Sequence, residues 1–92
     1  MCMLSQQNLD AAAFYKWSKI LIYLEERFGE ATIAAWFEGA VLVEFTDTVL
    51  KFRVDNAFYC DVINRRCLHH MQNALRELFH SAAAIEVFVS LP

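Results

Sequence analysis

The longest helical periodicity in the chain runs from Asn56 to His80. Apolar residues recur there at steps of three and four, which places them on one side of a helix; they are Cys60, Ile63, Cys67, Met71, Ala74 and Leu78. Asp55 and Asn56 supply short polar side chains of the kind that bond the free backbone N–H groups of a first turn. No glycine or proline interrupts the segment. The pattern predicts one continuous amphipathic helix.

A second helical pattern covers residues 10–28. Its apolar residues form one stripe about 80° wide on the helix wheel; they are Phe14, Trp17, Leu21, Leu24 and Phe28. Asp10 is the candidate N-cap, and Gly29 follows directly, where glycine readily adopts the positive φ that ends a helix. The first residues of the chain show no steady period. We therefore expect residues 1–9 to form a flexible arm and residues 10–92 to form one folded domain.

The period changes from helical to strand-like in the middle of the chain. Glu30 to Phe37 favours a short helix by propensity, and Gly39 ends it. Two alternating apolar runs follow, in which Val41, Val43 and Phe45, then Leu50, Phe52 and Val54, share one side. The turn between them, residues 46–48, contains no glycine. A last alternating run at residues 85–89 completes the order α-α-β-β-α-β.

The order of the elements predicts an α+β fold with a three-stranded sheet. The last strand should run parallel to the second, because a strand, a crossover helix and a strand in one sheet usually join parallel strands. Each strand has one apolar face and one face with charged residues, which are Glu44, Lys51, Arg53 and Glu86. We therefore expect all the helices to cover the same face of the sheet. The other face should be open, with Leu42 and Phe88 as its apolar residues.

Composition excludes several classes of protein. The 58% apolar and 21% charged content is typical of a folded domain, not a disordered chain. The formal net charge of −3 gives no overall attraction to nucleic acid or to an anionic membrane. No apolar run approaches the length of a membrane span, about 18 residues. The odd number of cysteines, at Cys2, Cys60 and Cys67, and the lack of a secretory leader favour a reducing intracellular setting.

Several positions taken together resemble one family. They are Trp17, Ile20, Leu21 and Leu24, then Trp36-Phe37, then the strand Val49–Val54 running into Asn56-x-Phe58. Their joint spacing and the order of the elements resemble the N-terminal domain of the bacterial replication initiator DnaA, over about residues 14–89. Two positions depart from that family: Asp55 stands where proline or a small residue is common, and Cys67 stands where a large residue is common.

The resemblance implies a KH-like fold that serves as a docking module. In that family the domain self-associates weakly and contacts the replicative helicase and regulators of initiation, so we expect those partners and a cytoplasmic, nucleoid-associated location. The chain would be either a fragment of a full initiator or a stand-alone protein. It has no G-x-x-x-x-G-K-[ST] motif, and its two glycines cannot form a phosphate-binding loop. We expect no enzymatic activity, no cofactor and no membrane partner.

Self-association would use the first helix. Tyr15 and Ile22 lie seven residues apart, on the side opposite the predicted core stripe, where a solvated helix usually carries charge. For Trp17 two roles remain open: the resemblance implies an exposed anchor for self-association, whereas the periodicity places it in the core stripe.

Partner docking would use the start of the long helix. Phe58 falls in its first turn, off the core stripe, and Tyr59 beside it is also off the stripe. The resemblance implies a partner-binding patch made by these aromatic residues with the start of the second helix, around Thr32. The alternative is that Phe58 packs locally against the hairpin.

Four side chains of the long helix are of types that bind metal ions, namely Cys60, Cys67, His69 and His70. The two cysteines are about 10 Å apart by helical rise alone, whereas sulfur atoms bound to one zinc ion lie within about 4 Å of each other. We therefore predict no metal, and expect both cysteines to pack as small apolar residues. No serine or acidic residue lies in a recognisable catalytic motif.

Binding of single-stranded nucleic acid is the alternative function. Four basic residues could form a strip, namely Lys51, Arg53, Arg65 and Arg66. The chain has no G-x-x-G loop to hold a nucleic-acid backbone, and its acidic residues outnumber its basic ones. We expect weak binding at most.

Overall fold

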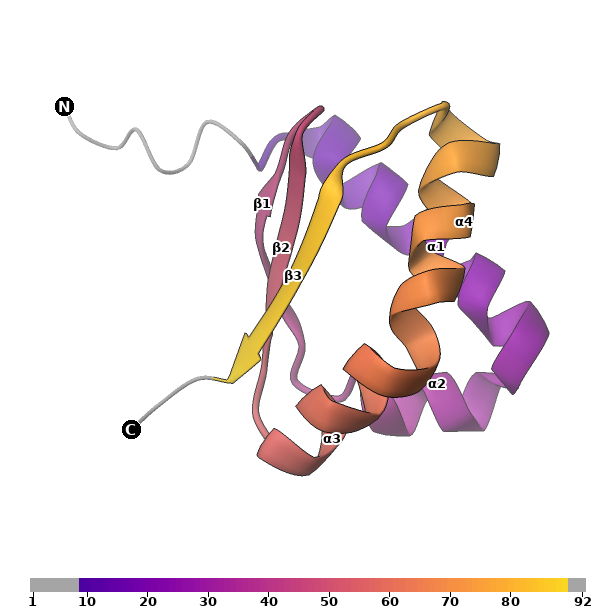
Figure 1. The fold of residues 1–92 in the computed structure, drawn as a ribbon, viewed down its shortest axis with the longest axis vertical. Coiled ribbons are helices and arrows are strands. Elements are labelled where there is room, and N and C mark those ends of the chain that lie inside the picture. The colour runs from indigo at the N-terminus through magenta and orange to yellow at the C-terminus, as the bar shows by residue number, and fades with distance from the viewer. Residues whose placement is uncertain (1–8, 90–92) are drawn as a thin grey trace, which may run out of the picture.

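The computed structural model describes residues 9–89, which form a three-stranded sheet with helices on one side (Figure 1). The elements are α1 (Ala11–Phe28), α2 (Glu30–Trp36), β1 (Val41–Phe45), β2 (Val49–Val54), α3 (Ala57–Val62), the π-helix η2 (Ile63–Cys67), α4 (Leu68–Phe79) and β3 (Ala84–Val89). The predicted class and order are confirmed, with the long helix divided into three consecutive segments. The predicted arm lies outside the described residues except for Leu9, which packs against the core.

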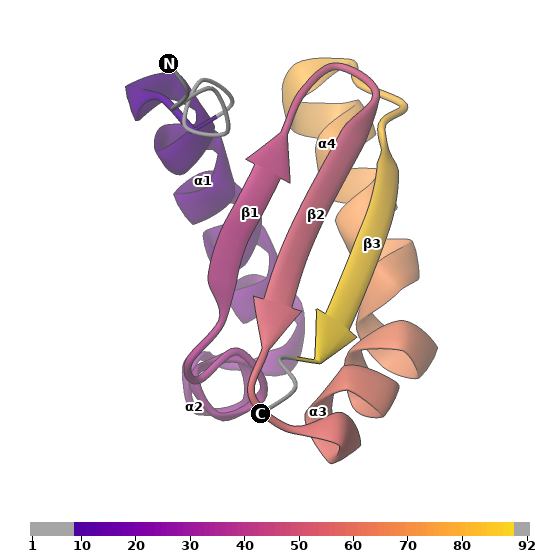
Figure 2. The ribbon, with the colours of Figure 1, turned by 90° about the vertical axis from the view of Figure 1, so that its left-hand side faces the viewer.

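β2 is the central strand of the sheet. It pairs antiparallel with β1 and parallel with β3, as predicted. Figure 2 shows the sheet in front of the helices, with α1 behind the β1 side and α4 behind the β3 side. The core lies between the two layers, and β2 supplies its centre through the fully buried side chains of Leu50, Phe52 and Val54. The predicted arrangement, with every helix on one face, is confirmed for the described residues.

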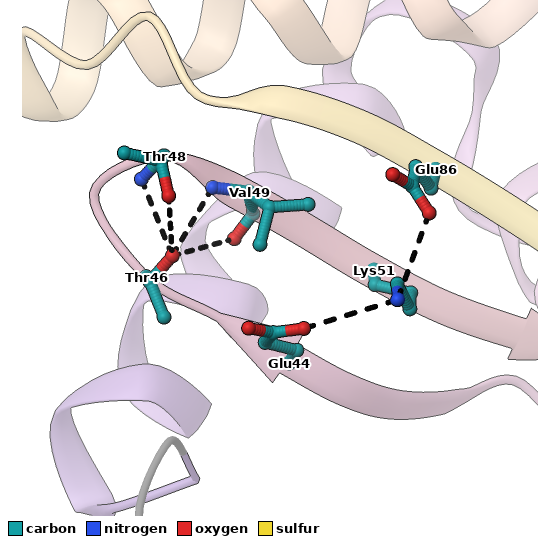
Figure 3. A network of polar contacts seen from close by, with 6 residues as sticks. All are labelled: Glu44, Thr46, Thr48, Val49, Lys51 and Glu86. Atoms are coloured by element: carbon teal, nitrogen blue, oxygen red, sulfur yellow. Dashed lines mark hydrogen bonds and ion pairs between the residues drawn. The ribbon is translucent and has the colours of Figure 1, made fainter.

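The turn between β1 and β2 is held by a threonine side chain. Thr46 Oγ1 accepts hydrogen bonds from the backbone N–H groups of Thr48, at 3.2 Å, and of Val49, at 3.1 Å (Figure 3). Hydroxyl side chains close short turns in this way without a residue at positive φ. This accounts for a tight hairpin in which no glycine is present.

β1 faces the core as predicted at Phe45, which packs against it, but not at Val41. Its register shifts between Leu42 and Glu44, so that Leu42 lies opposite Phe52 and both are buried, whereas Val41 is exposed. A β-bulge adds one residue to a strand and reverses the alternation of faces beyond it. The prediction that Leu42 lies on the open face was therefore wrong, because strict alternation does not reveal a bulge.

α1 begins and ends as predicted but buries a wider side. Asp10 accepts a hydrogen bond from the Ala13 N–H at 2.9 Å, and Gly29 has a φ of 94°. The buried residues are Ala13, Ile20, Tyr23 and Leu24. α1 packs against α2 and α4 as well as the sheet. Its buried side therefore includes Ile20 and Tyr23, which lie outside the predicted stripe. Phe14, predicted to be in the core, is 51% exposed, because periodicity gives the direction of a side chain but not whether a neighbouring element reaches it.

The long helix is not one continuous α-helix. The Leu68 N–H donates to the Ile63 carbonyl, five residues back, so η2 is a turn of π-helix. The wider turn keeps Ile63, Cys67 and Met71 in line at a spacing of four, and all three are fully buried. Nearer the end of α4, Leu75 is buried and Leu78, which the pattern had assigned to the core, is exposed.

Candidate interaction site

Asn56 positions an exposed aromatic residue in the first turn of α3. Its extended backbone, with φ −139° and ψ 126°, and its side chain make it the N-cap. Asn56 Oδ1 accepts hydrogen bonds from the backbone N–H of Phe58, at 2.7 Å, and of Tyr59, at 3.3 Å. These bonds satisfy two of the N–H groups that a helix leaves free at its start. The cap fixes the backbone that carries Phe58.

Phe58 and Tyr59 form the pair that we call the docking patch. The Phe58 side chain is 66% exposed, the highest value among the large apolar residues that the structure describes. Tyr59 is half-buried, and its ring lies edge-on to that of Phe58 with the centroids 5.3 Å apart. The second ring therefore supports the first from one side only, and most of Phe58 faces solvent.

The end of α2 lies close to the start of the docking patch. A Cβ added at Gly39, which has a φ of 75°, would collide with the Asp55 carboxylate, so the loop after α2 touches the residue just before Asn56. Figures 1 and 2 both place α2 and α3 at the same end of the molecule.

Thr32 belongs to the other end of α2. This end is held near α4, because the ring of Phe28 packs edge-on against His70 with the centroids 5.1 Å apart. Thr32 itself is half-buried. The structure thus brings Phe58 and Tyr59 together, while the described residues include no hydrogen bond or ring contact that joins Thr32 to either of them.

A second exposed apolar surface lies on α1. The side chains of Tyr15 and Ile22 are 59% and 47% exposed, and we call this pair the α1 outer face. Lys19 Nζ lies 5.3 Å from the centroid of the Tyr15 ring. A cation over an aromatic face stabilises the ring's position only weakly at an exposed site. The pair therefore presents apolar surface on a helix whose opposite side already supplies the core.

Trp17 packs inward from the same helix. Its ring centroid lies 5.0 Å from that of Phe52 in β2 and 6.1 Å from that of Phe37 after α2. Such contacts add to the free energy gained from burial. Of the two roles considered for Trp17, the core position is the one for which the structure supplies contacts.

The profile of the DnaA N-terminal domain family matches residues 15–77, from the second turn of α1 almost to the end of α4. The chain belongs to this family. Two curated relatives are the chromosomal replication initiator protein DnaA of Borrelia turicatae strain 91E135 and that of Borrelia hermsii strain HS1 / DAH. Each is 26% identical to this chain over 76 residues, which are 83% of this chain and 16% of the relative. The chain therefore spans about a sixth of the length of these relatives.

The four basic residues of this DnaA N-terminal domain lie on two separate elements, Lys51 and Arg53 in β2 and Arg65 and Arg66 in η2. Lys51 Nζ lies 3.9 Å from a carboxylate oxygen of Glu44 and 3.7 Å from one of Glu86. Arg65 Nε lies 3.0 Å from Asp61 Oδ2. Two of the four positive charges are thus offset by carboxylates, so the four residues do not form one uncompensated basic patch.

The two cysteines of the long helix differ in environment. Burial raises the pKa of the Cys67 thiol to about 12, so this thiol is protonated at neutral pH. Cys60 is half-buried, and its Sγ lies 3.8 Å from the Val87 carbonyl oxygen. Packing as a small apolar residue is confirmed for Cys67 and holds only partly for Cys60. Within residues 9–89, no group of three or more histidine, cysteine or acidic side chains is arranged to hold a metal ion.

Phe14 is the most exposed of the residues that the sequence pattern wrongly assigns to the core, ahead of Val41 and Leu78. A signal was available, because apolar residues occupy most sides of α1 on the helix wheel, more than one packed face can cover. A helix of this composition must expose some of them.

Neither α1 nor any other helix in the described part of the chain is long and apolar enough to cross a membrane.

Proposed function

We propose that this DnaA N-terminal domain is a protein-interaction module of bacterial replication initiation. It docks the replicative helicase and regulators of initiation through the docking patch, and it self-associates weakly through the α1 outer face. Membership of the family supports the general role, since both relatives are named as chromosomal replication initiators. The observation that carries the proposal is the 66% exposure of Phe58 on a capped helix.

The docking patch has the properties of an interface anchor. Aromatic side chains bury a large area at little cost in conformational entropy, and a few of them usually provide most of the binding free energy. Asn56 holds the backbone of Phe58 in place before a partner arrives, which lowers the entropy lost on binding. Thr32, at the far end of α2, would contact the rim of a partner that covers both helices.

Self-association in this proposal is weak because the surface is small. Two exposed side chains, Tyr15 and Ile22, supply far less area than the roughly 800 Å² per partner of a standard stable interface. We therefore expect a dissociation constant for the dimer of the order of 10⁻⁶ M or larger. Trp17 contributes by holding α1 against the sheet.

The proposed role includes no catalytic step and no cofactor. It requires the chain to act in the cytoplasm at the nucleoid. Nucleic acid is at most a weak secondary ligand in this proposal, because Lys51 and Arg65 are already paired with carboxylates. Any such contact should weaken steeply as salt increases.

The substitution Phe58→Ala tests the proposal. Loss of an interface anchor should weaken binding to the replicative helicase from the same source by about 2 kcal/mol, a factor of about thirty. Folding should change little, by about 0.5 kcal/mol or less, because the side chain is mostly in solvent. Titration calorimetry measures the first quantity, and the thermal midpoint measures the second.

Phe14→Ala is the matched control, since Phe14 is also an exposed phenylalanine but lies on α1, outside the docking patch and the α1 outer face. It should leave helicase binding unchanged. If Phe58→Ala instead lowers the thermal midpoint by about ten degrees with unchanged affinity per folded molecule, Phe58 serves the core and the proposal fails.

A further inference from the structure

β3 has a free edge. The strand order is β1-β2-β3, so β3 pairs with β2 on one side and with no strand among the described residues on the other. In Figure 1, β3 passes in front of β2 and no ribbon covers it. An uncovered edge strand is a template onto which another extended chain can pair.

The backbone groups at this edge have little to bind. The Ala84 N–H donates to the Thr48 carbonyl at 2.9 Å, so Ala84 faces β2 and alternate residues of the strand face the opposite way. The residues whose backbone groups point to the free edge are therefore Ile85, Val87 and Val89. Within residues 9–89, the side-chain donor to the Val87 carbonyl is the Cys60 thiol, a weak donor at 3.8 Å. A backbone N–H from another chain would be a stronger partner.

A hollow of about 500 Å³ runs along this edge. Its lining combines side chains from both faces of the strand, and these are Lys51, Asn64, Ile85, Glu86, Val87 and Phe88. The residues of β3 that line it alternate between apolar ones on the helix side and Glu86 and Phe88 on the open side. This is the surface that an extended segment would contact on pairing with β3.

The charges on the open face specify what this segment should carry. Glu44, Lys51 and Glu86 lie side by side on β1, β2 and β3 and form a row of alternating sign (Figure 3). Glu86 is the member at the β3 end of the row, and its side chain is 59% exposed. Opposite charges on neighbouring strands stabilise a sheet, and like charges destabilise it. The position beyond Glu86 therefore favours a lysine or an arginine.

A second copy of this chain does not supply that charge. The open-face residues of β3 are Ala84, Glu86 and Phe88, so two β3 strands would place no cation beside Glu86 in any register. The other edge strand, β1, also has no basic residue within Val41–Phe45. Pairing through either edge of a second copy leaves Glu86 without a cation.

We propose that the free edge of β3 binds an extended segment of another protein by strand addition. This segment carries a basic side chain beside Glu86 and an apolar side chain beside Phe88. The hydrogen bonds come from the outward backbone groups of the strand, and the charge row gives the register. The proposal uses neither Phe58 nor the α1 outer face, so it does not depend on the function proposed above.

The test uses a blocked synthetic peptide of about seven residues, in which valine alternates with threonine, lysine and tyrosine. On binding to the isotope-labelled chain, this peptide should shift the backbone amide signals of Ile85 and Val87. Glu86→Lys should weaken its binding about tenfold and favour a peptide with glutamate in place of the lysine, because the substitution replaces attraction by repulsion.

Glu44→Lys is the matched control. It changes the net charge by the same amount at the other end of the row, so it should leave binding of the lysine peptide within about twofold of the wild-type value. Phe58→Ala should also leave it unchanged. The proposal is overturned if the peptide does not bind, if both charge substitutions weaken binding equally, or if the shifts fall on another element. It is also overturned if the Ile85 and Val87 amide signals shift in the same way when the chain alone is concentrated, which would mean a dimer paired through β3.

Discussion

Trp17 and Phe58 are large aromatic residues on helices, and their surroundings are opposite. The ring of Trp17 lies against Phe37 and Phe52, which come from α2's end and from the central strand. The ring contact of Phe58 among the described residues is with its neighbour Tyr59, and the residue is mostly in solvent. Both positions contribute to the family resemblance, yet the ring of Trp17 packs on residues distant in the sequence and the ring of Phe58 on an adjacent one.

The difference shows how a stability role and a binding role can be separated. An aromatic side chain stabilises the fold when elements from elsewhere in the chain close over it, and its loss then leaves a cavity. One that stays in solvent costs little to remove from the folded chain and is available to a partner. Substitutions at the two residues should therefore move different measured quantities.

Trp17→Ala should give the largest change in stability. Removing a ring packed on Phe52 and Phe37 should lower the free energy of unfolding by about 3 kcal/mol, or about 15 °C in the thermal midpoint. Trp17→Phe keeps one ring against the core, so it should lower the free energy of unfolding by about half as much. Chemical denaturation followed by circular dichroism measures both. An unchanged midpoint for Trp17→Ala would mean that the ring is not part of the core.

Asn56→Ala should have an intermediate effect on both quantities. It removes the acceptor for the Phe58 and Tyr59 N–H groups, which should cost about 1 kcal/mol of folding free energy. It should also weaken helicase binding, because the first turn that carries Phe58 is then held less firmly. Asn56→Asp keeps a capping oxygen and serves as the control. Equal losses from the two substitutions would show that capping is not the cause.

Ile22→Glu should have the smallest effect on folding, within about 0.5 kcal/mol, because the side chain is already exposed on α1. It should nevertheless abolish weak self-association, since it places a charge in the α1 outer face. Sedimentation at increasing concentration measures this. Gln72→Glu, at an exposed polar position of α4, is a control for added charge alone. If Ile22→Glu leaves a dimer intact, the dimer uses another surface.

The elements and their order follow from local sequence signals. Asp10, Gly29 and Asn56 set the helix limits through caps and positive φ, and the change of period marks the strands. The parallel pairing of β2 and β3 follows from the handedness of crossover connections. These features depend on neighbouring residues or on general topology, so one sequence is enough to predict them.

The features that were not predicted from the sequence depend on contacts between elements that are distant in the chain. The bulge that turns Leu42 inward is set by its pairing with Phe52. Phe14 and Leu78 lie near helix ends, where burial depends on how far another element extends. In the candidate site, the helix wheel places Phe58 off the core stripe but leaves open whether it packs against the hairpin. The pairing of Lys51 with two carboxylates depends on the register of three strands.

The π-helix η2 separates α3 from α4, and this has a consequence for how the domain could change over evolution. A π turn holds one residue more than an α turn, so deleting one residue within Ile63–Cys67 would restore regular α-helix. The extra residue is taken up within a single turn, so this deletion would leave α3 facing nearly the same way relative to α4. A residue lost from a helix that is regular throughout instead rotates the segment before it by about 100°. The π turn behind the docking patch therefore lets the chain lose one codon there while Phe58 keeps its direction and its sequence context.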